Sequence, residues 1–242
     1  MEESQIKWDK ILLKIGGESL SDKENFPFSP ACLNFVAEEI KEIVNLGVKI
    51  GIMVGGGNIL RGKMLSQKGM ERTTTDYMGM LGTVINALAL QSVLEKKGII
   101  TRLQTAIEIK QVAEPYIRRR ALRHLEKGRL LILAGGTGNP YFTTDTAAAL
   151  RALEIEAKVI LKATKVKGVY SSDPAKDIKA KKFDEISYEE MLNRKLKIMD
   201  ATAISLCMEN HLPIIVFNFR EKGNIKKIIL GEKIGTRIGE QK

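Results

Sequence analysis

The chain has 242 residues, of which 44% are hydrophobic and 28% are charged, and its formal net charge is +10 at pH 7. This composition is ample for a sizeable core and normal for a soluble protein, and the length fits one large α/β domain or two small ones. The N-terminus lacks a signal-peptide pattern, no apolar run is expected to cross a bilayer, and Cys32 and Cys207 lack metal-ligand spacing. We therefore expect a soluble, cytoplasmic protein with reduced cysteines and no membrane partner.

The first part of the chain predicts two strands with a helix between them. Apolar residues run almost unbroken in the two strand segments and recur at helical spacing in the segment between them. The predicted elements are a strand at 10–15, a helix at 33–44 and a strand at 48–54, and glycines follow each of them: Gly16, Gly17, Gly47, Gly55, Gly56 and Gly57.

The segment from Met78 to Leu94 is apolar on nearly every face of the helix that it predicts. Such a helix must be buried, either in the core or against a partner chain. The second possibility indicates an oligomer.

The positive net charge has two interpretations. The arginines at 118–120 could form a basic patch for nucleic acid, or the charge could attract small anions such as nucleotides. The apolar residues of the same segment fall on one helical stripe, which leaves the arginines on the outer face: Ile117, Ala121, Leu122 and Leu125. Because no aromatic residues interleave with the basic ones, we favour a solvated face and do not expect a nucleic-acid partner.

Later segments alternate between short apolar strands and helices. Unbroken apolar runs of this length are typical of a parallel sheet that is buried on both faces. The predicted strands are 130–133, 159–161 and 214–217, and the predicted helices are 144–156, 188–193 and 201–209. Residues 171–185 are rich in charge and predict a mobile surface segment that could act as a lid. The predicted fold class is α/β, a three-layer α/β/α sandwich on a mainly parallel sheet, with 1–242 as a single domain.

Four loops follow predicted strands, and ligands of parallel sheets bind at that edge. The first loop joins Lys14 to Gly16 and Gly17. Backbone N–H groups at two glycines are open to a phosphate, and the lysine adds a positive charge beside them. A simple turn is the alternative interpretation of this loop.

The second loop has three consecutive glycines at 55–57, followed by Arg61. A structural turn rarely needs three glycines, whereas close approach to a bulky anion does, and a guanidinium suits phosphate oxygens. Residues 57–63 also fit G-x-x-x-x-G-K. However, Met64 replaces the Ser or Thr that binds Mg²⁺ in a P-loop, so we treat this match as accidental.

The third and fourth loops carry the remaining polar residues of interest. In the third loop, at 137–145, the turn at 138–140 bends the backbone, and Thr143 and Thr144 then begin a helix. Unpaired N–H groups at a helix N-terminus suit an anion. The fourth loop, at 162–174, combines lysines, a threonine, a tyrosine and an aspartate that could hold a nucleotide, and a lysine-rich surface turn is its alternative.

Together and in this order, the loops resemble the amino acid kinase family and, within it, the bacterial UMP kinases. The matching segments are K-x-[SG]-G-E, G-G-G-N-x-x-R, D-x-M-G-M-L, T-G-N-P-[FY]-F-T-T-D and K-A-T-K-V-x-G-V-[YF]-x-x-D-P. The resemblance runs from about Lys10 to Thr236. The T-G-N-P segment is its specific part, because members that phosphorylate carboxylates or carbamate lack it. The resemblance implies an enzyme that converts ATP and UMP to ADP and UDP in pyrimidine nucleotide synthesis.

The resemblance also implies roles for individual residues. It assigns the phosphoryl transfer to Lys14, Asp145, Lys162 and Asp200, with Lys165 as the alternative to Lys162. It assigns ATP contacts to Lys14, Ile15, Gly16, Gly17, Gly57, Arg61, Thr164, Tyr170 and Asp173. It assigns UMP contacts to Gly56, Asp76, Thr137, Gly138, Asn139, Pro140, Tyr141, Phe142, Thr143 and Thr144. The acceptor-binding part is expected at about 1–155 and the ATP-binding part at about 156–242.

The implied chemistry needs no strong general base. A nucleoside monophosphate already presents a charged oxygen, so catalysis can depend on alignment and on cancelling the charge of two anions. Mg²⁺ is expected to arrive on the ATP phosphates, without a protein metal site. Neither His124 nor His211 lies in a candidate loop, so both are expected to be structural or surface residues.

The resemblance extends to regulation and assembly, with some departures. It implies a homohexamer and feedback inhibition by UTP. Residues 21–30 contain two prolines and few glycines where the family has a Gly-rich stretch associated with GTP activation, so activation by GTP is left open. Gly16 stands where the bacterial enzymes often carry Ser. Arg102 and Arg129 match basic positions of an effector site.

Overall fold

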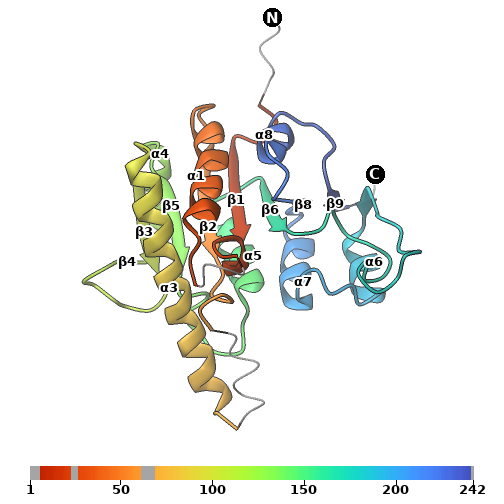
Figure 1. The fold of residues 1–242 in the computed structure, drawn as a ribbon, viewed down its shortest axis with the longest axis horizontal. Coiled ribbons are helices and arrows are strands. Elements are labelled where there is room, and N and C mark those ends of the chain that lie inside the picture. The colour runs from red at the N-terminus through yellow and green to blue at the C-terminus, as the bar shows by residue number, and fades with distance from the viewer. Residues whose placement is uncertain (1–5, 23–26, 61–68, 241–242) are drawn as a thin grey trace, which may run out of the picture.

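A computed structural model describes residues 6–22, 27–60 and 69–240. Nine strands of these residues form one sheet in the order β4-β3-β5-β2-β1-β6-β8-β9-β7 (Figure 1). The strands are β1 (Lys10–Ile15), β2 (Lys49–Val54), β3 (Thr101–Thr105), β4 (Glu114–Pro115), β5 (Leu130–Ala134), β6 (Val159–Thr164), β7 (Glu185–Ile186), β8 (Ile214–Asn218) and β9 (Thr236–Ile238).

Neighbouring strands run parallel except for β8 and β9, which are antiparallel, so the predicted mainly parallel sheet is confirmed. The central strands are buried on both faces. In β1, for example, Ile11 and Leu13 face one core and Leu12 faces the other. The sequence pattern does not predict β3, β4, β7 or β9. Polar Arg102 and Gln104 interrupt the apolar run of β3, and the other three strands have two or three residues each.

Helices cover both faces of the sheet and complete the predicted three-layer sandwich (Figure 1). Helices α1, α3 and α8 contribute to the core on one face, and α4, α5, α6 and α7 to the core on the other. Their bounds are α1 (Pro30–Val44), α3 (Arg72–Lys96), α4 (Arg118–Glu126), α5 (Thr144–Glu154), α6 (Tyr188–Asn193), α7 (Ala201–Glu209) and α8 (Asn224–Ile229), with a short 3₁₀ helix η1 (Gly17–Ser19).

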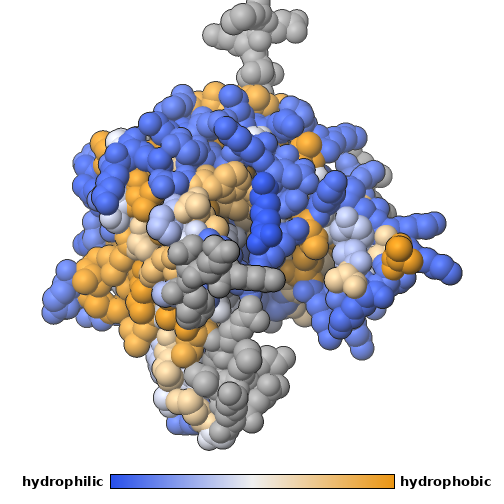
Figure 2. All heavy atoms as spheres, viewed as in Figure 1, coloured by the Kyte–Doolittle hydropathy of each residue, from blue (hydrophilic) through white to orange (hydrophobic). Residues whose placement is uncertain are grey.

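Helix α3 is longer than the predicted 78–94 and is only partly covered. Its inner side packs on α1 and β3, whereas Tyr77, Leu81 and Ile85 are 47%, 47% and 45% exposed. Figure 2 shows apolar side chains gathered over this helix. By length and composition α3 could cross a membrane, which corrects our expectation for the apolar runs. Of its most apolar stretch, 44% is buried inside the fold, and one such helix is weak evidence for a membrane span.

The apolar stripe predicted for α4 differs from the observed one. Ile117, which precedes the helix, is 47% exposed and Leu122 is only half-buried, so this part of the prediction is wrong. The buried residues of α4 are Ala121, His124 and Leu125. His124 can be buried because both of its ring nitrogens have hydrogen-bond partners.

The charge-rich segment at 171–185 forms a loop with few regular elements. An isolated bridge joins Tyr170 to Lys182, and the Ser171 N–H donates a hydrogen bond to the Lys181 carbonyl oxygen at 2.9 Å. The two sides of the loop are therefore tied at its base. Its mobility stays a prediction.

Candidate active site

The four predicted loops meet at one edge of the sheet. They follow β1, β2, β5 and β6, which are neighbours in the order β5-β2-β1-β6 and run parallel. Parallel neighbours end at the same edge, so the glycine loops, the turn after β5 and the lysine-rich loop after β6 converge there. Helix α5 also begins at this edge, and its N-terminal N–H groups and dipole favour an anion.

Strand register places Lys14 and Lys162 side by side. Lys14 on β1 is paired with Lys162 on β6. Side chains alternate along a strand, so both lysines point to the face that Leu12 and Ile160 share. Asp145, in the first turn of α5, lies between them. Its Oδ1 is 2.8 Å from the Lys14 Nζ and its Oδ2 is 2.5 Å from the Lys162 Nζ.

Lys165, the alternative to Lys162, lies away from this cluster. Its side chain is 53% exposed, and its Nζ is 3.5 Å from a carboxylate oxygen of Glu18. The Lys162 residue, by contrast, is only 8% exposed. Of the two lysines, Lys162 is therefore the one that lies beside Lys14.

Burial and charge act against each other in the lysine cluster. Burial favours the protonated form of Asp145, but the charges of Lys14 and Lys162 outweigh it and hold the pKa of this carboxyl below its usual value. Burial lowers the pKa of Lys162 to about 8, although Asp145 opposes this shift. At neutral pH the cluster carries two cations and one carboxylate, a net positive charge that suits a phosphoryl group.

The Asp200 carboxylate contacts two hydroxyls and a backbone N–H. It is the N-cap of α7 and accepts a hydrogen bond from the Ala203 N–H at 2.8 Å. It also accepts from the Thr146 hydroxyl at 2.9 Å and from the Thr143 hydroxyl. The Thr143 oxygen in turn accepts from the Asp145 N–H at 3.0 Å. A chain of hydrogen bonds through Thr143 thus links Asp200 to the Asp145 backbone.

The turn at the start of the third loop is built locally. The Thr137 hydroxyl oxygen accepts from the Asn139 N–H at 3.2 Å. Gly138 has a φ of +84°, a conformation that side chains rarely adopt. Pro140 and Thr144 are half-buried, and Thr144 is the first residue of α5.

Beyond this turn, the loop is held against the start of α3. The Asp76 Oδ2 accepts a hydrogen bond from the Tyr141 N–H at 2.8 Å and lies 3.0 Å from the Arg72 Nε. Tyr141 has a φ of 72°, which is unusual for a residue other than glycine. The rings of Tyr141 and Phe142 are 65% and 50% exposed. Two aromatic rings are therefore available to a ligand at this edge.

The glycines predicted to contact nucleotide are of two kinds. A Cβ on Gly17 would lie 2.1 Å from the Asn58 side chain, and one on Gly56 would lie 2.7 Å from a carbonyl oxygen of α3, so packing requires both glycines. A Cβ on Gly16 or Gly57 would meet nothing within 4 Å. These two positions border open space, where a ligand could approach the backbone.

Two buried residues of α3 hold these loops and are not singled out by the sequence analysis. The Asn86 Nδ2 donates to the Gly55 carbonyl oxygen and to the Asn58 Oδ1, both at 2.6 Å, and the Asn58 Nδ2 donates back to the Asn86 Oδ1 at 3.0 Å. The Thr83 hydroxyl accepts from the Gly135 N–H at 2.7 Å. The sequence held one signal for these two residues: each is a polar side chain within an apolar helix. A buried amide or hydroxyl needs hydrogen-bond partners, so such a residue points to a contact with another segment.

The other predicted ATP contacts are dispersed. The Thr164 hydroxyl lies at the edge, 3.0 Å from the Phe217 carbonyl oxygen. Tyr170 is half-buried at the base of the 171–185 loop, and Asp173 within that loop is exposed. The Ile15 side chain is buried in the core, which leaves only its backbone for a ligand. Arg61 lies outside the described residues.

The two arginines matched to an effector site are linked through one glutamate. The Arg129 Nη1 donates to the His124 Nδ1 at 3.1 Å, so the His124 Nε2 donates to a Glu114 carboxylate oxygen at 3.1 Å. The Arg102 Nε is 3.8 Å from the same carboxylate. This cluster lies near the β4 end of the sheet, apart from the lysine cluster on β1 and β6.

Within the part of the chain that the structure describes, no group of three or more His, Cys, Asp or Glu side chains could hold a metal ion. The carboxylates at the candidate site are already engaged, Asp145 by two lysines and Asp200 by hydroxyls. These residues fit a divalent cation that enters with its substrate, bound by phosphate oxygens.

Two lysines around one carboxylate, beside glycine loops and a helix N-terminus, define an α/β protein with a phosphoryl-transfer site. A sequence model of the Amino acid kinase family matches residues 9–218. The chain therefore belongs to the amino acid kinase family.

Solved structures agree with this assignment. A UMP kinase from Bacillus anthracis is 39% identical, with a TM-score of 0.94 over 97% of both chains. A UMP kinase from Ureaplasma parvum is 34% identical, with a TM-score of 0.91 over 97% of this chain and 100% of that chain. A uridylate kinase from Archaeoglobus fulgidus is 28% identical, with a TM-score of 0.74 over 95% of this chain and 100% of that chain.

Proposed function

We propose that this protein transfers the γ-phosphoryl group of ATP to UMP, which yields ADP and UDP for pyrimidine nucleotide synthesis. The observation that supports this proposal is the cluster of Lys14, Asp145 and Lys162 at the edge where the loop at 137–144 ends. The likeness to two UMP kinases at 39% and 34% identity supports the choice of acceptor.

In this reaction an oxygen of the UMP phosphate forms a bond to the γ-phosphorus of ATP, and the bond from that phosphorus to the bridging oxygen of ADP breaks. Both substrates are anions, so the protein must align them and offset their charge. Lys14 and Lys162 stabilise the transferred group, and Asp145 holds the two ammonium groups in place. Backbone N–H groups near Gly16 and Gly57 bind the ATP phosphates. Mg²⁺ enters as part of the Mg·ATP substrate and offsets further phosphate charge.

Each of the two parts of the chain binds one substrate. UMP is held by the acceptor-binding part, 1–155, through Gly56, Asp76 and the loop at 137–144, whose exposed aromatic rings cover it. ATP is held by 156–242 and by the glycine loops, with adenine and ribose at Thr164, Tyr170 and Asp173 and the phosphates near Lys14. Arg61 completes the ATP site.

A panel of phosphoryl acceptors tests the proposal. The protein is incubated with Mg·ATP and UMP, CMP, AMP, carbamate or a small carboxylate, and each product is quantified. We expect UDP to form at least about tenfold faster than any other product, because a site built to bond one base discriminates strongly against others. Absence of UDP, or preference for another acceptor, would overturn the proposal. DNA retention that falls with salt and persists in Lys14→Ala would instead indicate a nucleic-acid-binding protein.

Assembly and regulation complete the proposal. The exposed apolar side of α3 is covered in a homohexamer that works in the cytoplasm. UTP, the end product of the pathway, inhibits the enzyme, and the arginines at 102 and 129 bind the effector. The same acceptor panel with GTP or UTP added measures both responses, and it decides whether GTP activates.

A further inference from the structure

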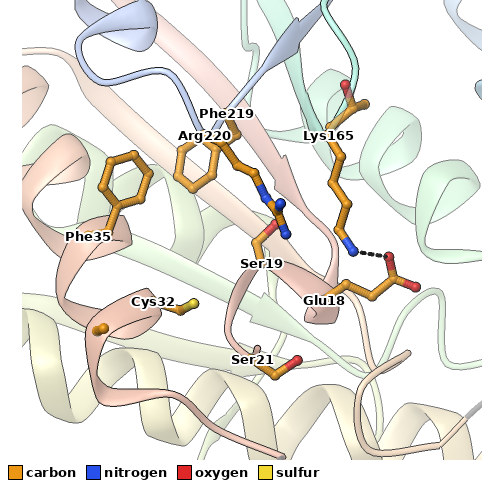
Figure 3. Close-up of a pocket in the computed structure, with 10 residues that line it drawn as sticks. Glu18, Ser19, Ser21, Cys32, Phe35, Lys165, Phe219 and Arg220 are labelled. Atoms are coloured by element: carbon orange, nitrogen blue, oxygen red, sulfur yellow. Dashed lines mark ion pairs between the residues drawn. The ribbon is translucent and has the colours of Figure 1, made fainter. Parts of the chain in front are cut away.

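A second pocket lies beside the proposed active site (Figure 3). It has a volume of about 280 Å³ and is bordered by α1, η1, the end of β6 and the loop after β8. Its apolar walls include Cys32, Phe35 and Phe219, and its rim carries Lys165 and Arg220. The lysine cluster and the loop at 137–144 do not line it, but Thr164, which is proposed to contact ATP, does. The proposed reaction therefore leaves the apolar walls of this pocket unexplained.

The walls of the pocket are fixed by contacts between distant segments. The rings of Phe35 and Phe219 meet edge to face, with centroids 5.6 Å apart and planes at 77°. The buried carboxylate of Glu39 on α1 accepts from the Gly223 N–H at 2.9 and 3.0 Å, which ties α1 to the segment before α8. The pocket is thus formed before any ligand binds, and ordering its walls adds little to the cost of binding.

The charges at the rim favour an anion. Among the described residues, no carboxylate lies within ion-pair distance of the Arg220 guanidinium, and Figure 3 shows this group reaching over Ser19. Lys165 lies 3.5 Å from Glu18 and offsets its charge. A planar apolar body packed against the aromatic wall and a single negative charge at an arginine match this arrangement.

We propose that this pocket binds a small aromatic monoanion, with its ring against Phe35 and Phe219 and its carboxylate at Arg220 and Ser19. The volume accommodates one or two fused rings and lies just below the roughly 300–1,000 Å³ of typical small-molecule pockets. Both η1 and Thr164 border this site and that of ATP.

Cys32 provides a direct measurement of occupancy. The chain has two cysteines, and Cys207 is fully buried, so iodoacetamide should modify Cys32. Indole-3-carboxylate serves as the probe, and alkylation of Cys32 is followed by mass spectrometry, with Cys32→Ser to assign the label. A ligand of this size is expected to bind with a dissociation constant on the order of 1 mM. At about ten times that concentration, alkylation should slow roughly tenfold.

Ligands and variants with altered charge separate this proposal from simple apolar binding. Neutral indole and the cation 3-(aminomethyl)indole should protect Cys32 at least about fivefold less well. Arg220→Gln should weaken protection by indole-3-carboxylate about fivefold, whereas the matched variant Arg123→Gln, on α4, should leave it unchanged. Saturating Mg·ADP should leave protection in place.

Three results would overturn the proposal: no protection of Cys32, equal protection by all three indoles, or complete displacement of the probe by Mg·ADP. The last result would make the pocket part of the nucleotide site. None of these measurements uses turnover, so the outcome does not depend on the proposed kinase activity.

Discussion

At the scale of single residues, the candidate site depends on Asp145. Its two carboxylate oxygens each contact one lysine, and its own position is fixed by Thr143 and Asp200. One carboxylate therefore holds two ammonium groups that would otherwise repel each other. The arrangement keeps positive charge at the place where the proposed reaction develops negative charge.

The lowered pKa of Lys162 predicts a pH dependence. Burial lowers this pKa to about 8, so Lys162 loses its proton as the pH rises through that value. The kcat/KM for Mg·ATP should then fall about tenfold per pH unit above about 8, because only the charged lysine stabilises the phosphoryl group. In Lys162→Arg the falling limb should move to higher pH, since arginine keeps its proton.

A matched substitution serves as the control for this profile. Lys158 lies just before the same strand, at the opposite edge of the sheet, and pairs with Asp9 at 2.8 Å. In Lys158→Arg the falling limb of the pH profile of kcat/KM should stay near pH 8. A limb that stays in place in Lys162→Arg would contradict the assignment. The free energy of unfolding should respond in the other direction. Between pH 8 and 10.5 the unfolded chain binds more protons at Lys162 than the folded chain does, so the contribution of Lys162 to stability rises with pH.

At the scale of elements, η1 and α3 form one unit. The first residue of η1, Gly17, packs against the buried amide pair of Asn58 and Asn86, which also fixes the Gly55 carbonyl oxygen. The Asn86 side chain of α3 thus holds the glycine loops after β1 and β2, although α3 is part of neither loop. Loop geometry here depends on packing between distant segments.

Gly17→Ala tests this unit. Its Cβ would lie 2.1 Å from the Asn58 Oδ1 and 2.9 Å from the Gly55 carbonyl oxygen. We expect a loss of about 1–3 kcal/mol in the free energy of unfolding, measured with urea, because overpacking forces neighbours apart. The kcat/KM should fall about 100-fold, since displaced backbone donors no longer meet the phosphates.

Gly16→Ala provides the comparison. Gly16 has a φ of −71° and a ψ of 145°, and a Cβ there meets nothing within 4 Å. This substitution should change stability by less than about 0.5 kcal/mol. Equal losses in the two variants would mean that the amide pair does not determine the loop geometry.

At the scale of the whole molecule, the uneven burial of α3 is the main feature to explain. Its inner side belongs to the core beside α1, yet large apolar side chains at 77, 81 and 85 face outward on successive turns. Exposed apolar surfaces of this kind mark association sites. This surface accounts for the proposed homohexamer better than any charged face of the molecule does.

Charge introduced on this surface should reduce assembly. In Leu81→Lys/Ile85→Lys, burying two ammonium groups against a partner is unfavourable, so the mass in solution should fall below that of the unmodified protein. Multi-angle light scattering after gel filtration measures the mass. Ile178→Lys is the control, because Ile178 is fully exposed on the 171–185 loop and should leave the mass unchanged. Unchanged mass in the α3 variant would exclude this side as the interface.

The sequence was sufficient for much of the fold and for the location of the site. Continuous apolar runs identified the central strands, helical spacing identified α1, and glycine-rich loops after the strands identified the edge of the candidate site. These signals are local, because strand, helix and turn preferences depend on neighbouring residues. The short strands β4, β7 and β9 lacked such a signal and exist because the sheet offers them a partner.

The sequence by itself determined which residues of the candidate site carry charge and which loops are open. Only the tertiary structure decided that Lys162 and not Lys165 lies beside Lys14, because strand register sets that pairing. It also showed that Asp200 accepts hydrogen bonds from Thr143 and Thr146 and that Asn86 supports the glycine loops. These contacts join residues between 28 and 57 positions apart. Local preferences cannot encode them, because they arise only when the layers pack together.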